Sequence, residues 1–385
     1  MDEAPAIRIV YDLLHTALGV RASDIHCEPT QEHMRVRYRI DGTLFDQQSI
    51  PLDIAFQVLS RLKVLARIDI AEKRIPQDGK FSITAQGGDV DVRIATFPSM
   101  YGEKIVVRIL DRRKSLFNIN NVGLSPRMHD EIISIIGKQR GFFLVTGATG
   151  SGKTTTLYAA LSYINDTKKN IVTLEDPIEY TIGGITQGLI NHDIGFTFER
   201  GIRALLRQDP DVIMVGEIRD RETARVAIQA ALTGHLVMST LHTNDAPGAL
   251  MRLLDMSIEP FLINAALTGI VAQRLAKKLC TLCRYEVPLT VDIINLNKKY
   301  KLGIKRMFSA SGCTACKNLG ESGRIGIFEL LRMSEQLRML VHGKPHFDTI
   351  FQQAFDEGWR PLFYDAAHKL NEGIIPVHEF LQCIV

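Results

Sequence analysis

Residues 147–154 of the chain are Gly147-Ala148-Thr149-Gly150-Ser151-Gly152-Lys153-Thr154. They satisfy the pattern G-x-x-x-x-G-K-[ST], in which glycines let backbone N–H groups curl around phosphate oxygens without side-chain collision. An apolar run, Phe142 to Val145, precedes this phosphate loop, and a helical pattern follows it. The helix would aim its positive dipole end at the phosphates. The sequence therefore predicts a nucleotide site between a buried strand and a helix.

The side chains at the end of the phosphate loop have distinct expected roles. Lys153 would reach the β and γ phosphates, and the Thr154 hydroxyl would ligate Mg²⁺. Thr155, which follows directly, is included in the predicted nucleotide-binding set. The alternative is a glycine-rich turn that arose by chance, which the flanking strand and helix disfavour.

From Gly141 to about Val271, short apolar runs alternate with helical stretches, which predicts βα units and a parallel sheet. The predicted buried strands are Phe142–Val145, Ile171–Leu174, Val212–Val215 and Leu236–Met238. Asp220 is a candidate cap for the helix after the third strand, and Gly234 is a candidate terminator. Each run ends in polar residues, where a parallel sheet presents its ligand site.

Glu217 is the candidate general base, because the run Val212–Val215 delivers it to a strand end. Hydrolysis requires a carboxylate that orients or deprotonates the attacking water. The alternative is a surface carboxylate paired with Arg219 or Arg221.

A second acidic strand end contains Glu175 and Asp176, either of which could hold magnesium and its waters. His235 and His242 bracket another strand and are candidates to sense or stabilise the γ-phosphate. A lone histidine is more often a structural hydrogen-bonding residue, and that alternative stays open for both.

Residues 1–112 are expected to form an α+β domain. A helical apolar face over residues 7–18 is followed by alternating patterns at 35–40 and 90–94, which predict strands. Asp41-Gly42 and Asp78-Gly79 are predicted hairpin-type turns. The charged and Asn-rich stretch 113–123 is predicted to be a linker. Beyond it we expect an ATPase core at 124–279, a cysteine-bearing subdomain at 280–320 and a C-terminal helical region at 321–385.

Four cysteines form two close pairs, Cys280-x-x-Cys283 and Cys313-x-x-Cys316, an arrangement that suits a structural tetrahedral Zn²⁺. The 29 residues between the pairs exceed the commonest zinc-ribbon spacing, so unmetallated loops remain the alternative. Cys27 and Cys383 are predicted to be small buried hydrophobes.

The composition and length of the chain limit the classes of function that it can have. The 385 residues suggest two or three domains. The excess of 46 Lys and Arg over 43 Asp and Glu is too small to argue for nucleic acid, whose binders usually show a concentrated basic face. The first twenty residues lack the pattern of a secretory signal, and no window holds eighteen successive apolar residues. We expect a cytoplasmic protein that does not span a membrane.

These motifs together resemble a known family, the bacterial secretion and pilus-assembly ATPases, and in particular the type II secretion ATPase and its type IV pilus extension relative. The resemblance covers nearly the whole chain. Besides the phosphate loop and the four cysteines, it rests on the segments Ala22–His26, Arg74–Gly79, Glu175–Tyr180, Arg207–Asp211, Val215–Asp220 and Ser239–Asn244.

The resemblance implies a RecA-like ATPase domain preceded by a PAS-like domain, which is the second N-terminal domain of the family layout. Residues 171–180 resemble the aspartate box, 207–220 the Walker B region and 235–244 the histidine box, which supports catalytic roles for Glu175 and His242. Gly216 stands where other phosphate-loop enzymes carry a magnesium-binding aspartate. Positions that match nucleotide-contacting arginines of the family's N-terminal domain are Arg74, Arg93 and Arg108, for which surface ion pairs are the alternative.

The family resemblance also implies a homo-hexamer at the cytoplasmic face of the inner membrane, held there by partners. These are a membrane platform protein and a membrane-anchored adaptor, and the motor pushes pilin-like subunits into a fibre. The cysteine pairs favour an assembly ATPase over retraction ATPases. The stretches Ser60–Arg67 and Asp91–Arg93 favour type II secretion over pilus extension. A DNA-translocating ATPase and a nucleotide-gated scaffold without turnover are the less favoured alternatives.

Overall fold

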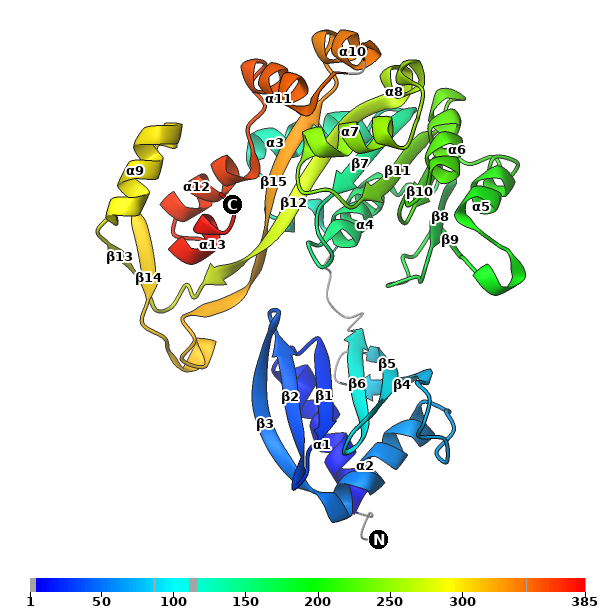
Figure 1. Cartoon of the computed structure of the whole chain (residues 1–385), viewed down its shortest axis with the longest axis vertical. Helices are drawn as coiled ribbons and strands as arrows, with labels where there is room; N and C mark the ends of the chain where they lie inside the picture. Colours follow the sequence, from blue (N-terminus) through cyan, green and yellow to red (C-terminus); the bar gives the residue numbers. More distant parts are fainter. Residues whose placement is uncertain (1–4, 86–87, 111–116, 344, 385) are drawn as a thin grey trace. The chain divides into compact units, whose positions relative to one another are not determined.

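The described residues form two large sheets, one in each of two units, residues 1–115 and 116–385, and a small two-stranded sheet in the second unit (Figure 1). The computed structural model describes residues 5–85, 88–110, 117–343 and 345–384. Residues 113–116 of the predicted linker lie outside the described part. The rest of that linker packs onto the second unit, because Ile119 is buried in its core and Gly326 donates a backbone hydrogen bond to Val122 at 3.1 Å.

The first unit is an antiparallel sheet with the strand order β3-β2-β1-β6-β5-β4. Its strands are β1 Asp24–Pro29, β2 His33–Ile40, β3 Thr43–Pro51, β4 Asp78–Ala85, β5 Gly88–Ser99 and β6 Gly102–Leu110. Helices α1 (Pro5–Gly19) and α2 (Leu52–Leu65) contribute their apolar faces to one core with alternate residues of the strands. The predicted α+β character of this part of the chain is confirmed.

Of the two predicted turns in this unit, one is confirmed and one is wrong. Asp41 and Gly42 have φ values of +48° and +88° and join β2 to β3 as a two-residue hairpin. Asp78 and Gly79 instead begin β4. Glycine is needed at 79 for a close approach and not for a turn, because a Cβ there would lie 2.6 Å from the Ala66 carbonyl oxygen.

The second unit is built on a sheet with the strand order β15-β12-β7-β11-β10-β8-β9, and its four predicted strands are confirmed. They are β7 Gly141–Thr146, β8 Ile171–Glu175, β10 Val212–Val215 and β11 Leu236–Leu241, all parallel and fully buried; β9 is Thr186–Leu189. Helices α3 (Pro126–Ile136) and α4 (Lys153–Ile164) share a core with one face of the sheet. The other face packs against α5 Phe198–Leu205, α6 Arg221–Leu232, α7 Ala246–Asp255 and α8 Pro260–Ala266. Asp220 caps α6, as predicted.

A long antiparallel pair, β12 (Leu267–Leu279) and β15 (Glu321–Arg332), completes the sheet and carries the cysteine-bearing subdomain. Residues 321–332, which the sequence placed in a helical region, form a strand because they pair along the edge of β12. Between the two strands lie β13 Arg284–Val287, α9 Val291–Tyr300 and β14 Met307–Ala310; after them come α10 Glu335–His342, α11 Phe347–Asp356, α12 Leu362–Asn371 and α13 Val377–Leu381. Among the described residues, no helix has the length and apolarity that crossing a bilayer requires.

Candidate active site and metal centre

The carboxyl ends of four parallel strands meet at one edge of the second sheet. Thr146 pairs with Leu241, and Val215 pairs with both Leu174 and Ser239. The phosphate loop and the segments that begin at residues 175, 216 and 242 therefore leave the sheet at the same edge. The structure thus brings the predicted residues Lys153, Glu175, Glu217 and His242 to one end of the unit.

The phosphate loop has the backbone that its glycines predict. Gly147, Gly150 and Gly152 have φ values of +148°, +78° and +89°, in the region that favours glycine. A Cβ at Gly147 would also lie 2.4 Å from the Gln273 carbonyl oxygen. Lys153 is the first residue of α4, and its Nζ donates to the carbonyl oxygens of the first two loop residues at 2.8 and 3.1 Å.

Glu217 lies between a cation and a histidine at the end of β10. Arg219 Nη2 is 2.5 Å from its Oε1, and His242 Nε2 is 3.3 Å from its Oε2. Burial raises the pKa of Glu217, but the hydrogen bond and charge of Arg219, with a smaller effect of His242, lower it below its usual value. Burial lowers the pKa of Lys153, and the charge of Glu217 opposes that shift, so the two groups interact. Of the two arginines considered as partners, Arg221 pairs instead with Glu259.

Glu175 is buried at the carboxyl end of β8, with 3% of its surface exposed. Its oxygens accept hydrogen bonds from the Tyr158 hydroxyl on α4, from Thr173 Oγ1 at 2.6 Å and from Gln187 Nε2 at 2.9 Å. Asp176, the next residue, is exposed and lies 3.3 Å from His192 Nε2. Of the two carboxylates proposed to hold magnesium and its waters, Asp176 is therefore the accessible one.

Thr154 and the two histidines differ in their distance from this edge. Thr154 is exposed in the first turn of α4, and Thr155 beside it is half-buried. His242 follows the carboxyl end of β11, but His235 precedes the amino end of that strand. His235 Nδ1 lies 2.9 Å from the Ala230 carbonyl oxygen, which supports the structural alternative for this histidine.

The four paired cysteines form a compact cluster, and no other such group of His, Cys, Asp or Glu side chains occurs in the described part of the chain. All four Sγ atoms lie within 4.8 Å of one another, with separations of 3.8 Å for Cys280–Cys313, 3.8 Å for Cys283–Cys316 and 3.7 Å for Cys313–Cys316. A tetrahedron with Zn–S bonds of about 2.3 Å has edges of about 3.8 Å. The backbone N–H groups of Cys313 and Gly320 donate to Cys316 Sγ at 3.1 and 3.3 Å. The cluster therefore fits a closed tetrahedral Zn²⁺ site.

The remaining two cysteines lie apart from this cluster. Cys27 is fully buried on β1, and Cys383 is half-buried near the end of the chain. Burial raises the pKa of the two thiols to about 12 and about 11, respectively. The prediction of a small buried hydrophobe is confirmed for Cys27, whereas Cys383 is only partly buried.

A family model described as "Type II/IV secretion system protein" matches residues 1–382. The chain belongs to this family. It is 45% identical over 381 residues to the type II secretion system protein E of Pseudomonas aeruginosa, which covers 99% of this chain and 76% of that relative. It is 43% identical over 385 residues to the type II secretion system ATPase E of Vibrio cholerae, with coverage of 99% and 76%.

Two solved structures extend the comparison. The DotB ATPase of Legionella pneumophila matches with a TM-score of 0.74 and 21% identity, covering 100% of this chain and 97% of that one, which shows a shared fold. The pilus retraction motor PilT with bound ADP matches with a TM-score of 0.64 and 25% identity, covering 97% and 96%. The predictions of this ATPase family, of a type II secretion ATPase homologue and of the fold class are thus confirmed.

Within this secretion ATPase homologue, Gln273 is a residue that sequence reasoning missed. It lies on β12, is 1% exposed, and its Nε2 donates to the Ser151 carbonyl oxygen at 2.6 Å. The sequence signal was a polar residue that interrupts an apolar run. Gln273 therefore supports the phosphate loop from the neighbouring strand.

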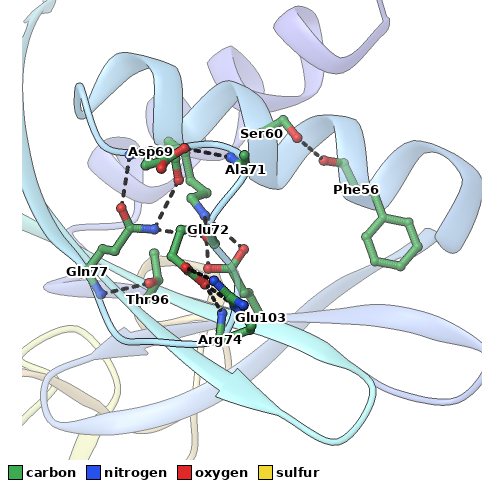
Figure 2. Close-up of polar contacts among 10 residues, drawn as sticks. Phe56, Ser60, Asp69, Ala71, Glu72, Arg74, Gln77, Thr96 and Glu103 are labelled. Atoms are coloured by element: carbon green, nitrogen blue, oxygen red, sulfur yellow. Dashed lines mark hydrogen bonds and ion pairs between the residues drawn. The ribbon is translucent and has the colours of Figure 1, made fainter.

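The three predicted arginines lie in the first unit. Arg74 is exposed in the segment after α2 and forms an ion pair with Glu72 at 2.7 Å, which Figure 2 shows. Arg93 on β5 and Arg108 on β6 are directly paired in register, and Arg108 contacts Asp24 at 3.0 Å. The surface ion pairs considered as alternatives are thus present for Arg74 and Arg108, and contact of all three with nucleotide stays a prediction.

A buried ion pair that sequence reasoning missed holds the segment that carries Arg74. Lys63 on α2 is 2% exposed and Glu103 on β6 is 5% exposed, with 3.0 Å between Nζ and each carboxylate oxygen. Lys63 Nζ also donates to the Glu72 carbonyl oxygen at 2.5 Å. Gln77 Nε2 donates to the same carbonyl at 3.0 Å. Glu72, Gln77 and Glu103 are labelled in Figure 2.

Proposed function

We propose that the chain is the ATP-hydrolysing motor of a type II secretion system, and that it works as a homo-hexamer that powers assembly of a pseudopilus. The observation that carries the proposal is the Glu217 carboxylate, held by Arg219 and His242 at the sheet edge from which the phosphate loop leaves. Membership of the secretion family and the named relatives support it.

In this proposal, backbone N–H groups of residues 147–152 bind the phosphates and Lys153 contacts the β and γ groups. Thr154 would hold Mg²⁺ with help from Asp176, and the ion would neutralise developing phosphate charge. Glu217 orients the attacking water and accepts its proton, because its lowered pKa keeps it ionised at neutral pH. His242 supports Glu217, and Glu175 fixes α4 through Tyr158.

The other parts of the proposal concern cofactors and partners. Arg74, Arg93 and Arg108 are proposed to contact the nucleotide of the assembled hexamer, and the four-cysteine cluster is proposed to hold one structural Zn²⁺. The motor would be cytoplasmic, held at the inner membrane by a platform protein and a membrane-anchored adaptor. Type IV pilus extension is the second candidate function, and isolation of the platform protein bound to this chain distinguishes the two.

ATP binding and hydrolysis by the assembled hexamer test the active site. We expect Glu217→Gln to bind ATP with unchanged affinity and to lose at least ~100-fold in kcat, since general-base catalysis contributes about 10²–10⁴-fold. Lys153→Ala should lose binding as well. Glu222→Gln, an exposed carboxylate in the first turn of α6, is the matched control and should retain full activity. Normal hydrolysis by the Glu217 variant would contradict the assignment, and DNA-stimulated hydrolysis would favour a DNA-translocating ATPase instead.

A further inference from the structure

Glu329 is a buried carboxylate to which the proposed hydrolysis gives no role. It lies on β15 and is 1% exposed. Its Oε1 accepts a hydrogen bond from the backbone N–H of Ala246 at 2.6 Å, and its Oε2 accepts one from the N–H of Leu362 at 2.8 Å. These are the first residues of α7 and α12, so one side chain joins the starts of two helices that are more than a hundred residues apart in sequence.

Several opposing effects act on the pKa of Glu329, and burial is the largest of them. Burial raises its pKa to about 8, with a smaller contribution from the charge of Asp245, whereas the two N–H donors and Arg274 lower it. The positive ends of both helix dipoles also favour a negative group at this point. An apolar residue at 329 would leave both N–H groups without this acceptor in a buried environment.

The segment that Glu329 fixes on the α7 side is the histidine loop, residues 242–245. His242 at its start contacts Glu217. Thr243 next to it is held by Thr146, through an N–H···Oγ1 bond of 2.9 Å and a contact of 2.8 Å between the two hydroxyl oxygens. Asp245 ends the loop and caps α7 by accepting the Gly248 N–H at 2.6 Å. The loop is therefore fixed at its beginning by β7 and just beyond its end by Glu329.

Thr146 and Glu329, the two residues that anchor the histidine loop, lie in one row of register-paired residues across the sheet. Glu329 on β15 is paired in register with Ala272 on β12, and Ala272 is paired with Thr146 on β7. The separation between the anchors is therefore set by strand spacing, which a packed sheet holds nearly constant. A loop tied to both anchors keeps its position relative to the phosphate loop, which begins directly after Thr146.

We propose that Glu329 is a positioning residue for ATP hydrolysis: it fixes the start of α7, so that the histidine loop holds His242 against Glu217, and it couples this loop to α12. The inference rests on the proposed function, in which Glu217 and His242 act in hydrolysis. A role in stability alone would lower the free energy of unfolding but leave kcat per folded hexamer unchanged.

The first test is the kinetics of Glu329→Gln in the assembled hexamer. The amide keeps one acceptor oxygen, so one of the two N–H groups loses its partner. We expect kcat to fall about tenfold with KM for ATP within twofold, because small displacements of catalytic groups cost up to ~100-fold in rate. The matched control is Glu379→Gln on α13, a carboxylate residue that is also buried, 8% exposed, and should retain kcat. Equal kcat values for the two variants would overturn the proposal.

A double-mutant cycle tests whether Glu329 acts through the histidine loop. In a His242→Ala background, Glu329→Gln should reduce kcat by less than twofold, since residues that act through one another are not additive. If Glu329→Gln reduced kcat by the same factor in the His242→Ala background as in the unmodified protein, the two residues would act independently and the proposal would be overturned. If Glu217→Gln and His242→Ala both hydrolyse ATP normally, the proposed function of this edge fails. If they are impaired and Glu329→Gln is not, the positioning inference alone fails.

Folding of the variants is checked by zinc content and by the emission of Trp359, which lies close to the start of α12 in sequence. If Glu329→Gln does not fold, Glu329→Asp keeps the carboxyl group with its two oxygens and shortens the side chain by one methylene. We expect the aspartate variant to lose about threefold in kcat with unchanged KM. This loss is smaller than the ~100-fold that a misplaced catalytic group can cost. Full activity of the aspartate variant would contradict a positioning role that depends on reach.

Discussion

Replacing Glu103 by glutamine is expected to destabilise the N-terminal unit by about 3–5 kcal/mol. The Lys63 and Glu103 side chains are 2% and 5% exposed, and Lys63 Nζ lies 3.0 Å from both carboxylate oxygens. Glutamine removes the negative charge but leaves the ammonium group buried. The Glu72 carbonyl would remain as a neutral acceptor, which only partly compensates a buried charge.

This loss is large compared with the stability of a domain of this size. Native domains are stable by roughly 5–15 kcal/mol, and one kcal/mol moves the melting temperature of a small domain by about 4–8 °C. The unit that contains Glu103 should therefore melt roughly 12–40 °C lower in the variant. The double variant Lys63→Met, Glu103→Leu removes both charges and should recover most of the loss.

The assay uses the full chain and two optical signals. Trp359 is the one tryptophan in the sequence and is buried in the second unit, so fluorescence excited at 295 nm follows that unit alone. Far-UV circular dichroism follows both units. We expect Glu103→Gln to lower the midpoint temperature of the circular dichroism transition of the first unit. The midpoint temperature followed by Trp359 fluorescence should stay unchanged. The control is Glu32→Gln, an exposed carboxylate of the first unit. A Glu103 variant that melts within a few degrees of the Glu32 variant would refute the reasoning.

Two further predictions concern the active site and the metal centre. Arg219→Ala removes the main group that lowers the pKa of Glu217, so that burial should raise this pKa. The acid limb of the pH profile of kcat/KM should then move to higher pH. Arg221→Ala is the control, and equal pH profiles for the two variants would contradict the electrostatic account. Purified protein should contain one zinc per chain by atomic absorption, and Cys316→Ser should lose it while Cys27→Ala keeps it; zinc retained by the Cys316 variant would rule out four-sulfur ligation.

The features predicted correctly from sequence are those with a local signal. Apolar runs such as Val212–Val215 became buried parallel strands because a run that is apolar on both faces suits the centre of a covered sheet. The glycine spacing at 147–152 specified the phosphate loop because positive φ values are needed there. The spacing of the cysteine pairs predicted a cluster that the fold indeed assembles.

The features that sequence reasoning missed depend on partners distant in the chain. Strand β15 pairs with β12, some fifty residues earlier. Gly323, Ile325 and Gly326 are a local signal against a helix, but the edge on which the strand pairs is set by the distant β12. Lys63 is flanked by Leu62 and Val64 and looks like a surface lysine, since its partner Glu103 lies forty residues away. The burial of Glu175 follows in the same way from Tyr158 on α4.

Strand β12 has the properties of a lever arm. It contacts the phosphate loop through Gln273 and ends one residue before Cys280, the first residue of the four-cysteine cluster. Seven residues of strand span about 23 Å, so a tilt of about 10° pivoting at Gln273 would displace the cluster by about 4 Å. Pairing with β15 stiffens the arm along its length. A small adjustment at the phosphate loop would therefore produce a larger displacement of the four-cysteine cluster at the far end of the strand pair.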